Sequence, residues 1–158
     1  MQQIAGITDL PYWQMMISAG LAFVRGGIAT ASVGNFSEIG IFNPVGSGIT
    51  VTLHSAYIFA PAGVSCAMRL LAGGLTTDLG AGQPLVPSFA PGVAHVQSAT
   101  PPAADGTLIS AWHRPTDAQP HQLPVFSWEI GAGVCVLFTT DAVNQAISGE
   151  FYWVERPL

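Results

Sequence analysis

The sequence contains no lysine, and its positive charge comes from four arginines. Only 8% of the 158 residues are charged, against about a quarter in an average soluble domain, and the formal net charge is −5. Proteins bind nucleic acids with clustered basic side chains that displace counterions from the phosphates. The composition therefore argues against a DNA or RNA partner.

Long apolar helices are also lacking, although 49% of the residues are hydrophobic. A membrane-spanning helix needs about 20 consecutive apolar residues, whereas the longest uncharged segments, 39–68 and 79–104, are interrupted by proline, glycine and histidine. The first residues have no basic segment followed by an apolar core, as a signal peptide requires. We therefore expect no membrane partner and a chain that is made and kept in a cytoplasm.

Cysteine is scarce as well. Cys66 and Cys135 lie far apart and form no short metal-binding motif. In a cytoplasmic protein, such cysteines are more often free thiols than a disulfide or a metal clip. We predict two buried thiols, and a chain of this length can bury a sizeable core without such cross-links.

Glycine and proline are abundant, with 18 and 12 copies. They separate short segments in which apolar and polar residues alternate. The segment Ile49–His54 alternates strictly, which predicts a strand with Ile49, Val51 and Leu53 facing the core. The turn formers of residues 43–48 precede it, and residues 36–42 predict a partner strand across that loop.

Similar strand candidates continue to the end of the chain: 22–32, 63–72, 107–113, 125–130, 133–139 and 150–155, with a short strand near 92–96 in the loop-rich region 72–104. Many short strands with turns at short spacing predict an all-β fold, an antiparallel β-sandwich of which the jelly roll is one form. We expect a single β-sandwich domain over residues 21–158. A short N-terminal arm or helix over residues 1–20 precedes it.

The N-terminal arm contains a cluster of large apolar side chains. Asp9 is predicted to cap a short helix with Pro11 in its first turn and Gly20 at its end. The cluster either docks on a neighbouring subunit, where aromatic and methionine side chains make adaptable anchors, or packs on its own domain. Together with the C-terminal residues it gives the predicted interface: Tyr12, Trp13, Met15, Met16, Ile17, Arg156 and Leu158.

The low charge also bears on association. Lysines on edge strands and mixed surface charge normally keep β-sheet proteins apart, and both are scarce here. We infer that copies of the chain or other partners cover much of its surface. The alternative is a monomer that its serine, threonine, glutamine and glycine residues keep in solution.

No reaction centre is apparent in the sequence. His113, Asp117 and His121 have a helical metal-ligand spacing, but Pro115 and Pro120 exclude that helix. The chain has no Gly-x-Ser-x-Gly elbow and no lysine for a nucleotide-phosphate loop. We therefore predict no catalytic residue, no metal and no cofactor.

Two glutamates accompany aromatic strand segments. Glu129 and Glu150 could form the carboxylate pair of a sugar-cleaving or sugar-binding groove. The alternative is that the aromatic residues form the core and both glutamates lie on the solvated face. In the last strand, alternation places Phe151, Trp153 and Glu155 on one side.

The segment "FSEIGIFNPVGSGITVTLHSAYIF", together with the closing "GEFYWVERPL", resembles segments of structural proteins from tailed bacteriophage particles. The resemblance covers about a third of the chain. It implies a β-sandwich module present in many copies, similar to the decoration or cement proteins that bind the outside of the capsid and clamp adjacent shell subunits, often as trimers. The implied partners are the major capsid protein and further copies of the chain. The implied location is the capsid surface of a virion made in the host cytoplasm, and the resemblance implies no catalytic residue.

Two other assignments remain open. One is a tail, fibre or baseplate module of the virion that binds a host glycan through exposed aromatic residues. The other is an unrelated small-ligand sandwich or hydrolase, for which a well-formed pocket lined by His113, His121 and Glu129 would be the sign.

Overall fold

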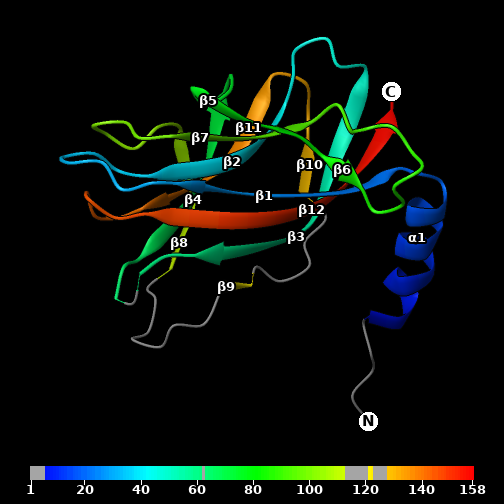
Figure 1. Ribbon diagram of the computed structural model, residues 1–158, viewed down its shortest axis with the longest axis horizontal. Coiled ribbons are helices and arrows are strands. Elements are labelled where there is room, and N and C mark those ends of the chain that lie inside the picture. The colour runs from blue at the N-terminus through cyan, green and yellow to red at the C-terminus, as the bar shows by residue number, and fades with distance from the viewer. Residues whose placement is uncertain (1–5, 62, 113–120, 123–127) are drawn as a thin grey trace.

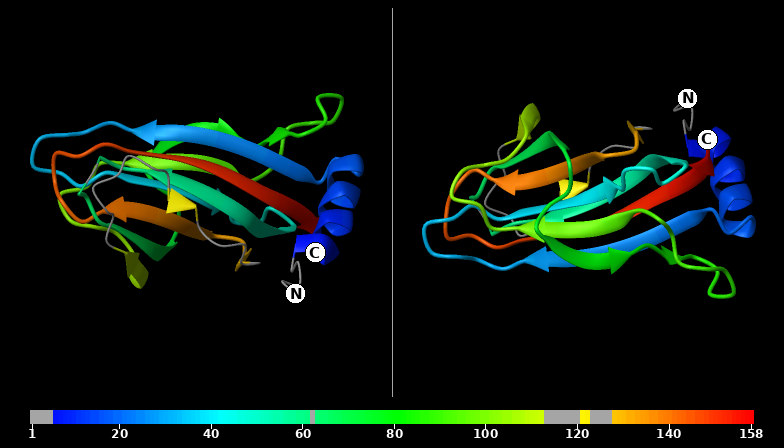
Figure 2. Two further views of the ribbon diagram at one scale, coloured as in Figure 1. Left: turned by 90° about the horizontal axis from the view of Figure 1, so that it is seen from below. Right: turned by 90° about the horizontal axis from the view of Figure 1, so that it is seen from above.

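The computed structural model describes residues 6–61, 63–112, 121–122 and 128–158. These residues form one helix, α1 (Gly6–Ser18), and two antiparallel β-sheets that pack together (Figures 1 and 2). The first sheet has the spatial order β10 (Trp128–Ile130), β3 (Ile49–Phe59), β12 (Ile147–Pro157), β1 (Ala22–Ala29) and β6 (Gln83–Pro84), with β9 (His121–Gln122) paired to β3. The second has the order β5 (Thr77–Ala81), β7 (His95–Ala99), β2 (Glu38–Asn43), β11 (Val134–Thr140), β4 (Cys66–Ala72) and β8 (Thr107–Trp112).

The strand order is that of a jelly roll. With the inserted strands β5 to β7 and the short β9 set aside, the first sheet runs β1-β12-β3-β10 and the second runs β2-β11-β4-β8. Early strands of the chain therefore lie beside late ones in both sheets, as in two interlocked Greek keys. The predicted all-β, antiparallel sandwich with a short N-terminal helix is confirmed.

The predicted pairing of residues 36–42 with residues 49–54 is wrong. Both strands form, but β2 pairs with β7 and β11, whereas β3 pairs with β10 and β12. The loop between them crosses from one sheet to the other. Asn43 secures this crossing, because its side-chain amide donates to the carbonyl oxygens of Ile49 (3.1 Å) and Ile130 (2.9 Å).

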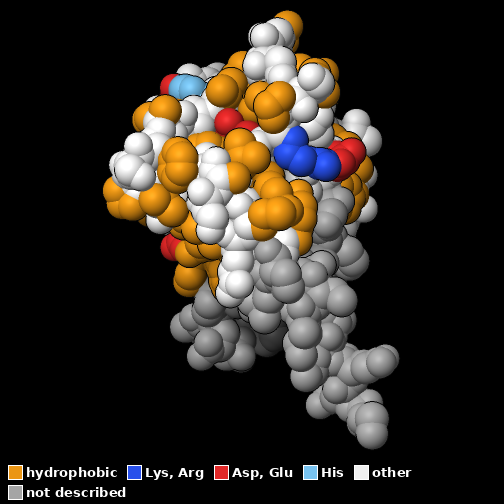
Figure 3. Space-filling model, turned by 90° about the vertical axis from the view of Figure 1, so that its right-hand side faces the viewer, with side chains coloured by type: hydrophobic (Ala, Val, Ile, Leu, Met, Phe, Trp, Pro, Cys, Tyr) orange, Lys and Arg blue, Asp and Glu red, His pale blue; other side chains and the backbone are white. Residues whose placement is uncertain are grey.

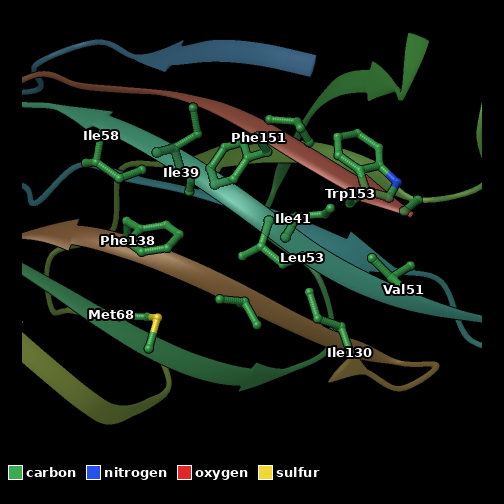
Figure 4. Close-up of a cluster of buried hydrophobic side chains, with 14 of the residues drawn as sticks. Ile39, Ile41, Val51, Leu53, Ile58, Met68, Ile130, Phe138, Phe151 and Trp153 are labelled. Carbon is green, nitrogen blue, oxygen red and sulfur yellow. The ribbon is translucent and has the colours of Figure 1, made fainter. Parts of the chain in front are cut away.

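The main core lies between the two sheets (Figure 4). Val51 and Leu53 of β3 are 0% and 3% exposed, which confirms the side of this strand predicted to face inward. They meet side chains from both sheets, and full burial of each large apolar side chain contributes about 1.5–3 kcal/mol. The largest fully buried apolar members are Trp153, Phe138, Phe151, Ile39, Ile41, Ile58, Ile130, Ile147, Val51 and Val96.

A second, smaller cluster lies on the outer side of the second sheet. It consists of Leu75, Ala99, Cys135 and Leu137, with Phe42 and Leu71 packed against it. Cys135 and Cys66 are both buried thiols, as predicted. Burial raises the pKa of the Cys135 thiol to about 12, and the nearby Glu38 adds to this effect.

The loop-rich region is more ordered than the sequence indicates. Instead of one short strand near residues 92–96, the chain forms β5, β6 and β7, and β7 begins only at His95. β6 has two residues, which pair with Phe23 and Val24. Such short strands depend on pairing with distant segments, so local alternation cannot reveal them.

Helix α1 lies at one end of the sandwich, beside the C-terminus, and the loop between β1 and β2 lies at the opposite end (Figures 1 and 2). No helix within the described ranges is both long and apolar enough to cross a bilayer.

Candidate functional site

Helix α1 begins earlier than predicted, at Gly6, so Asp9 lies inside its first turn instead of capping it. The predicted end at Gly20 is confirmed. Gly20 has φ of 72°, and the amides of Gly20 and Leu21 donate to the carbonyl oxygens of Ile17 and Met16. These two bonds form a Schellman motif.

The helix contacts its own sandwich through one side. The Trp13 ring stacks on the His54 ring of β3, with a centroid distance of 4.4 Å and an interplanar angle of 12°. Met16 and Ile17 follow Trp13 at helical spacing, and both are half-buried. Tyr12 and Met15 lie on another side and are 40% and 56% exposed. Of the two alternatives for the arm, intramolecular packing therefore accounts for Trp13, while Tyr12 and Met15 stay accessible.

The loop between β6 and β7 lies against the C-terminal end of the helix. A Cβ atom placed on Gly20 would lie 2.4 Å from ring atoms of Phe89, so the ring occupies the space that glycine leaves. The loop is bonded to the sandwich, because the Leu85 amide donates to Ala22 O and the Gly92 amide to Gly82 O. The Phe89 side chain remains 41% exposed.

The C-terminal residues complete this end of the molecule. The Leu158 amide donates to Gly48 O at 3.0 Å, and the Leu158 side chain is 87% exposed. Arg156 donates to the Glu129 carboxylate at 2.6 Å and to the Thr52 hydroxyl at 3.3 Å. Both partners of this ion pair are substantially exposed, so it contributes less than about 1 kcal/mol to stability.

Val45 belongs to the loop between β2 and β3, whose Gly48 carbonyl accepts the Leu158 amide. Five exposed apolar side chains thus belong to the segments at this end, and we name them the helix-end surface: Tyr12, Met15, Val45, Phe89 and Leu158. The described part of this face is mainly apolar or uncharged, with few charged side chains (Figure 3). The ion pair between Arg156 and Glu129 is electrically neutral overall. Scattered apolar residues are normal on surfaces, but a gathering of them with little charge is typical of an interaction site.

The possible carboxylate pair does not form. Glu129 is opposite Thr52, and Glu150 is opposite Tyr57 of the same strand, so five residue steps, or roughly 16 Å, separate them. Both lie on the outer face of the first sheet, while Phe151 and Trp153 lie in the core.

Glu150 has a different role on that outer face. Its carboxylate accepts a short hydrogen bond from the Tyr152 hydroxyl, which raises the pKa of Tyr152 to about 12. The Tyr152 ring meets the Tyr57 ring edge to face at a centroid distance of 6.0 Å.

Farther along the same strands lies a shallow, open depression of about 210 Å³. None of its lining residues is charged. They are Ile28, Phe59, Ala60, Pro61, Ala146, Ile147 and Ser148.

Two buried carboxyl groups have roles that sequence reasoning did not assign. Glu155 is 5% exposed and accepts hydrogen bonds from the backbone amides of Val93 and Ala94 and from the Trp153 indole. The alternation of β12 placed Glu155 on the side of the core aromatic residues, which is the signal that could have identified it. It connects β12 to the loop that carries Phe89.

Glu38 is fully buried on the outer side of the second sheet. One carboxyl oxygen accepts the Asp105 amide at 2.8 Å, and the other has no hydrogen-bond partner. Burial raises the pKa of Glu38 to about 7 from its ordinary value of 4.5. No local pattern indicates this position, since the covering segment lies more than sixty residues away in the sequence.

His113 and Asp117, which share a metal-ligand spacing with His121 in the sequence, lie outside the described residues, and of His121 only the backbone, in β9, is described. Among the side chains that the structure describes, no group of three or more His, Cys, Asp or Glu residues could hold a metal ion. Comparisons of the chain with models of protein families, with curated proteins and with solved structures returned no match.

Proposed function

We propose that this chain is a non-enzymatic structural protein of a tailed-bacteriophage particle. It binds the outside of the capsid as a decoration, or cement, protein and clamps adjacent shell subunits. Its partners are the major capsid protein and other copies of itself, in a homo-oligomer for which the resemblance implies a trimer. The observation that carries the proposal is the helix-end surface, where exposed apolar side chains gather with little charge.

The size of the molecule is compatible with this role. A stable protein–protein interface buries about 800 Å² on each partner, which is about a tenth of this chain's surface of 8003 Å². Interface cores are depleted in charged residues and enriched in aromatic residues and methionine, as Tyr12, Met15 and Phe89 provide here. The jelly roll is an architecture that viral capsid domains use, although a fold alone does not fix a function.

Clamping is a binding effect. A protein that binds only the closed arrangement of two shell subunits stabilises that arrangement by mass action. Particles that carry the chain should therefore open at a higher temperature than particles that lack it.

The first test is the copy number of the chain in purified particles, measured by quantitative mass spectrometry against the major shell protein. A decoration protein is expected in a simple ratio to the shell protein. A few copies per particle would instead place the chain in the tail, and its absence from every particle would overturn the proposal.

The second test uses two matched substitutions. Met15→Glu introduces a charge into the helix-end surface, whereas Val33→Glu introduces one at the opposite end, where Val33 is 95% exposed. Neither side chain supports the core. Met15→Glu should weaken binding to particles that lack the chain by more than about tenfold, as for an interface anchor, while Val33→Glu should bind like the wild type. Equal binding by both variants would contradict the role of this surface.

One observation favours the tail, fibre or baseplate alternative. Tyr57, Tyr152 and Glu150 form an aromatic and acidic group on the outer face of the first sheet, and jelly rolls also occur in lectins. Binding of the isolated chain to an array of glycans, abolished by Tyr57→Ala, would support this alternative over a capsid clamp.

A further inference from the structure

The connection between β7 and β8 is held against the second sheet from two sides. From β2, Glu38 accepts the Asp105 amide at 2.8 Å. From β4, Arg69 donates through Nε to Asp105 O at 2.5 Å and through a terminal nitrogen to Gly106 O at 2.8 Å. Residues 100–106 thus cover the buried carboxyl group and lead directly into β8.

We propose that Glu38 is a proton-dependent latch, which keeps the connection between β7 and β8 closed while protonated and releases it when ionised. The proposal rests on the burial of the carboxyl group and on its second oxygen, which has no hydrogen-bond partner. An ionised carboxylate that is buried with an unpartnered oxygen is costly. Opening of residues 100–106 removes this cost by admitting water to that oxygen.

The charged and titratable groups around Glu38 come from three neighbouring segments. The Asp105 carboxyl, in the covering connection, opposes ionisation by its negative charge, whereas the Arg69 guanidinium, in β4, favours it. Cys135, in β11, lies opposite Phe42 on the same face of the sheet, four residues along from the position opposite Glu38, and its thiol stays neutral because its own pKa is about 12. Burial outweighs the help from Arg69, so the closed state keeps its proton up to about neutral pH.

Opening of residues 100–106 also affects β8, the strand that follows them in the chain. Among the strands that the structure describes, β8 is the last of the second sheet, and it pairs with β4. It has no charged residue, and its Leu108 and Ile109 are 53% and 40% exposed. Unpaired strand edges are places where other chains add, so the protonation state of Glu38 would change how firmly the start of β8 is held. This inference goes beyond the proposed function and stands without it.

The test is hydrogen exchange measured by mass spectrometry on residues 100–108 at pH 5 and pH 8, for the full chain and for Glu38→Gln. Glutamine cannot ionise but retains the oxygen that accepts the Asp105 amide. With a pKa of about 7 in the closed state and an ordinary value in the open state, the opening equilibrium should rise about 70-fold from pH 5 to pH 8. Exchange is corrected for its intrinsic pH dependence.

The wild type should show this increase, and Glu38→Gln should not. Glu129→Gln, which changes an exposed carboxylate, is the matched control and should behave like the wild type. The amides of β11 provide a reference within the wild-type chain, so the pH effect can be measured even if Glu38→Gln does not fold. Equal opening of residues 100–108 at both pH values in the wild type would overturn the latch.

Discussion

The carboxylate of Glu155 should be a principal stabilising group of the helix end of the sandwich. Its Oε1 lies 2.8 Å from the Ala94 amide, 3.0 Å from the Val93 amide and 3.0 Å from the Trp153 indole nitrogen, and its Oε2 lies 2.8 Å from the Val93 amide. All three donors therefore converge on one buried side chain. We predict that Glu155→Gln is strongly destabilising although it changes almost no volume.

The magnitude follows from this arrangement. A hydrogen bond to a charged group contributes about 1.5–3 kcal/mol. Glutamine removes the charge from all three bonds, and its NH2 group replaces one oxygen opposite the Val93 amide, so that one donor faces another. We expect a loss of about 3 kcal/mol, which for a domain of this size lowers Tm by roughly 6–12 °C.

The assay is thermal unfolding of the wild type, Glu155→Gln and Glu129→Gln at pH 7. Glu129 is the control because its bond to Arg156 is exposed, and loss of such a pair costs less than about 1 kcal/mol. Glu155→Gln should also speed hydrogen exchange in residues 85–93, since Glu155 holds the end of that loop. If Glu155→Gln unfolds at the same temperature as Glu129→Gln, the buried carboxylate does not stabilise this end of the sandwich.

Three further predictions concern other positions. Burial raises the pKa of Glu38 to about 7, so between pH 4.5 and about 7 the folded chain binds more protons than the unfolded chain. The contribution of Glu38 to the free energy of unfolding is therefore complete below pH 4.5. It falls by at most about 3 kcal/mol as the pH rises to 7. Urea unfolding across this range should show the fall in the wild type and not in Glu38→Gln. Gly20→Ala should cost about 1–2 kcal/mol in the same assay, because alanine is strained at φ of 72° and would collide with Phe89. Cys66 and Cys135, both buried, should react with a thiol reagent only upon unfolding, and rapid labelling of the native chain would contradict their placement.

Much of the fold could be predicted because strand signals are local. The alternation of Ile49–His54 identified both the strand and its buried side, and the predicted ends of the strands at 66–72, 107–112 and 134–140 lie within about three residues of those observed. Pairing was less predictable. β2 and β3 are consecutive in the sequence but belong to different sheets, because both bury an apolar face and the loop crosses the core instead of reversing within one sheet.

The candidate site was likewise only partly predictable from the sequence. The apolar cluster of the N-terminal arm is evident in the sequence, but only the structure separates Trp13, which stacks on His54, from the exposed Tyr12 and Met15. It also brings Phe89 and Leu158, far apart in the sequence, to the same end of the sandwich as the helix.

Four properties are already evident in the sequence: the low charge of the chain, its β-strand class, the burial of its two thiols and the end of its helix at Gly20. Each of these depends on composition or on residues a few positions apart. The sheet that each strand joins and the partners of the buried acids depend on the tertiary structure. Glu38 resembles any other glutamate in a strand, and the alternation of β12 indicates the side of Glu155 but not its partners. Segments more than sixty residues away close over both carboxyl groups, and burial and hydrogen bonding depend on such neighbours in space.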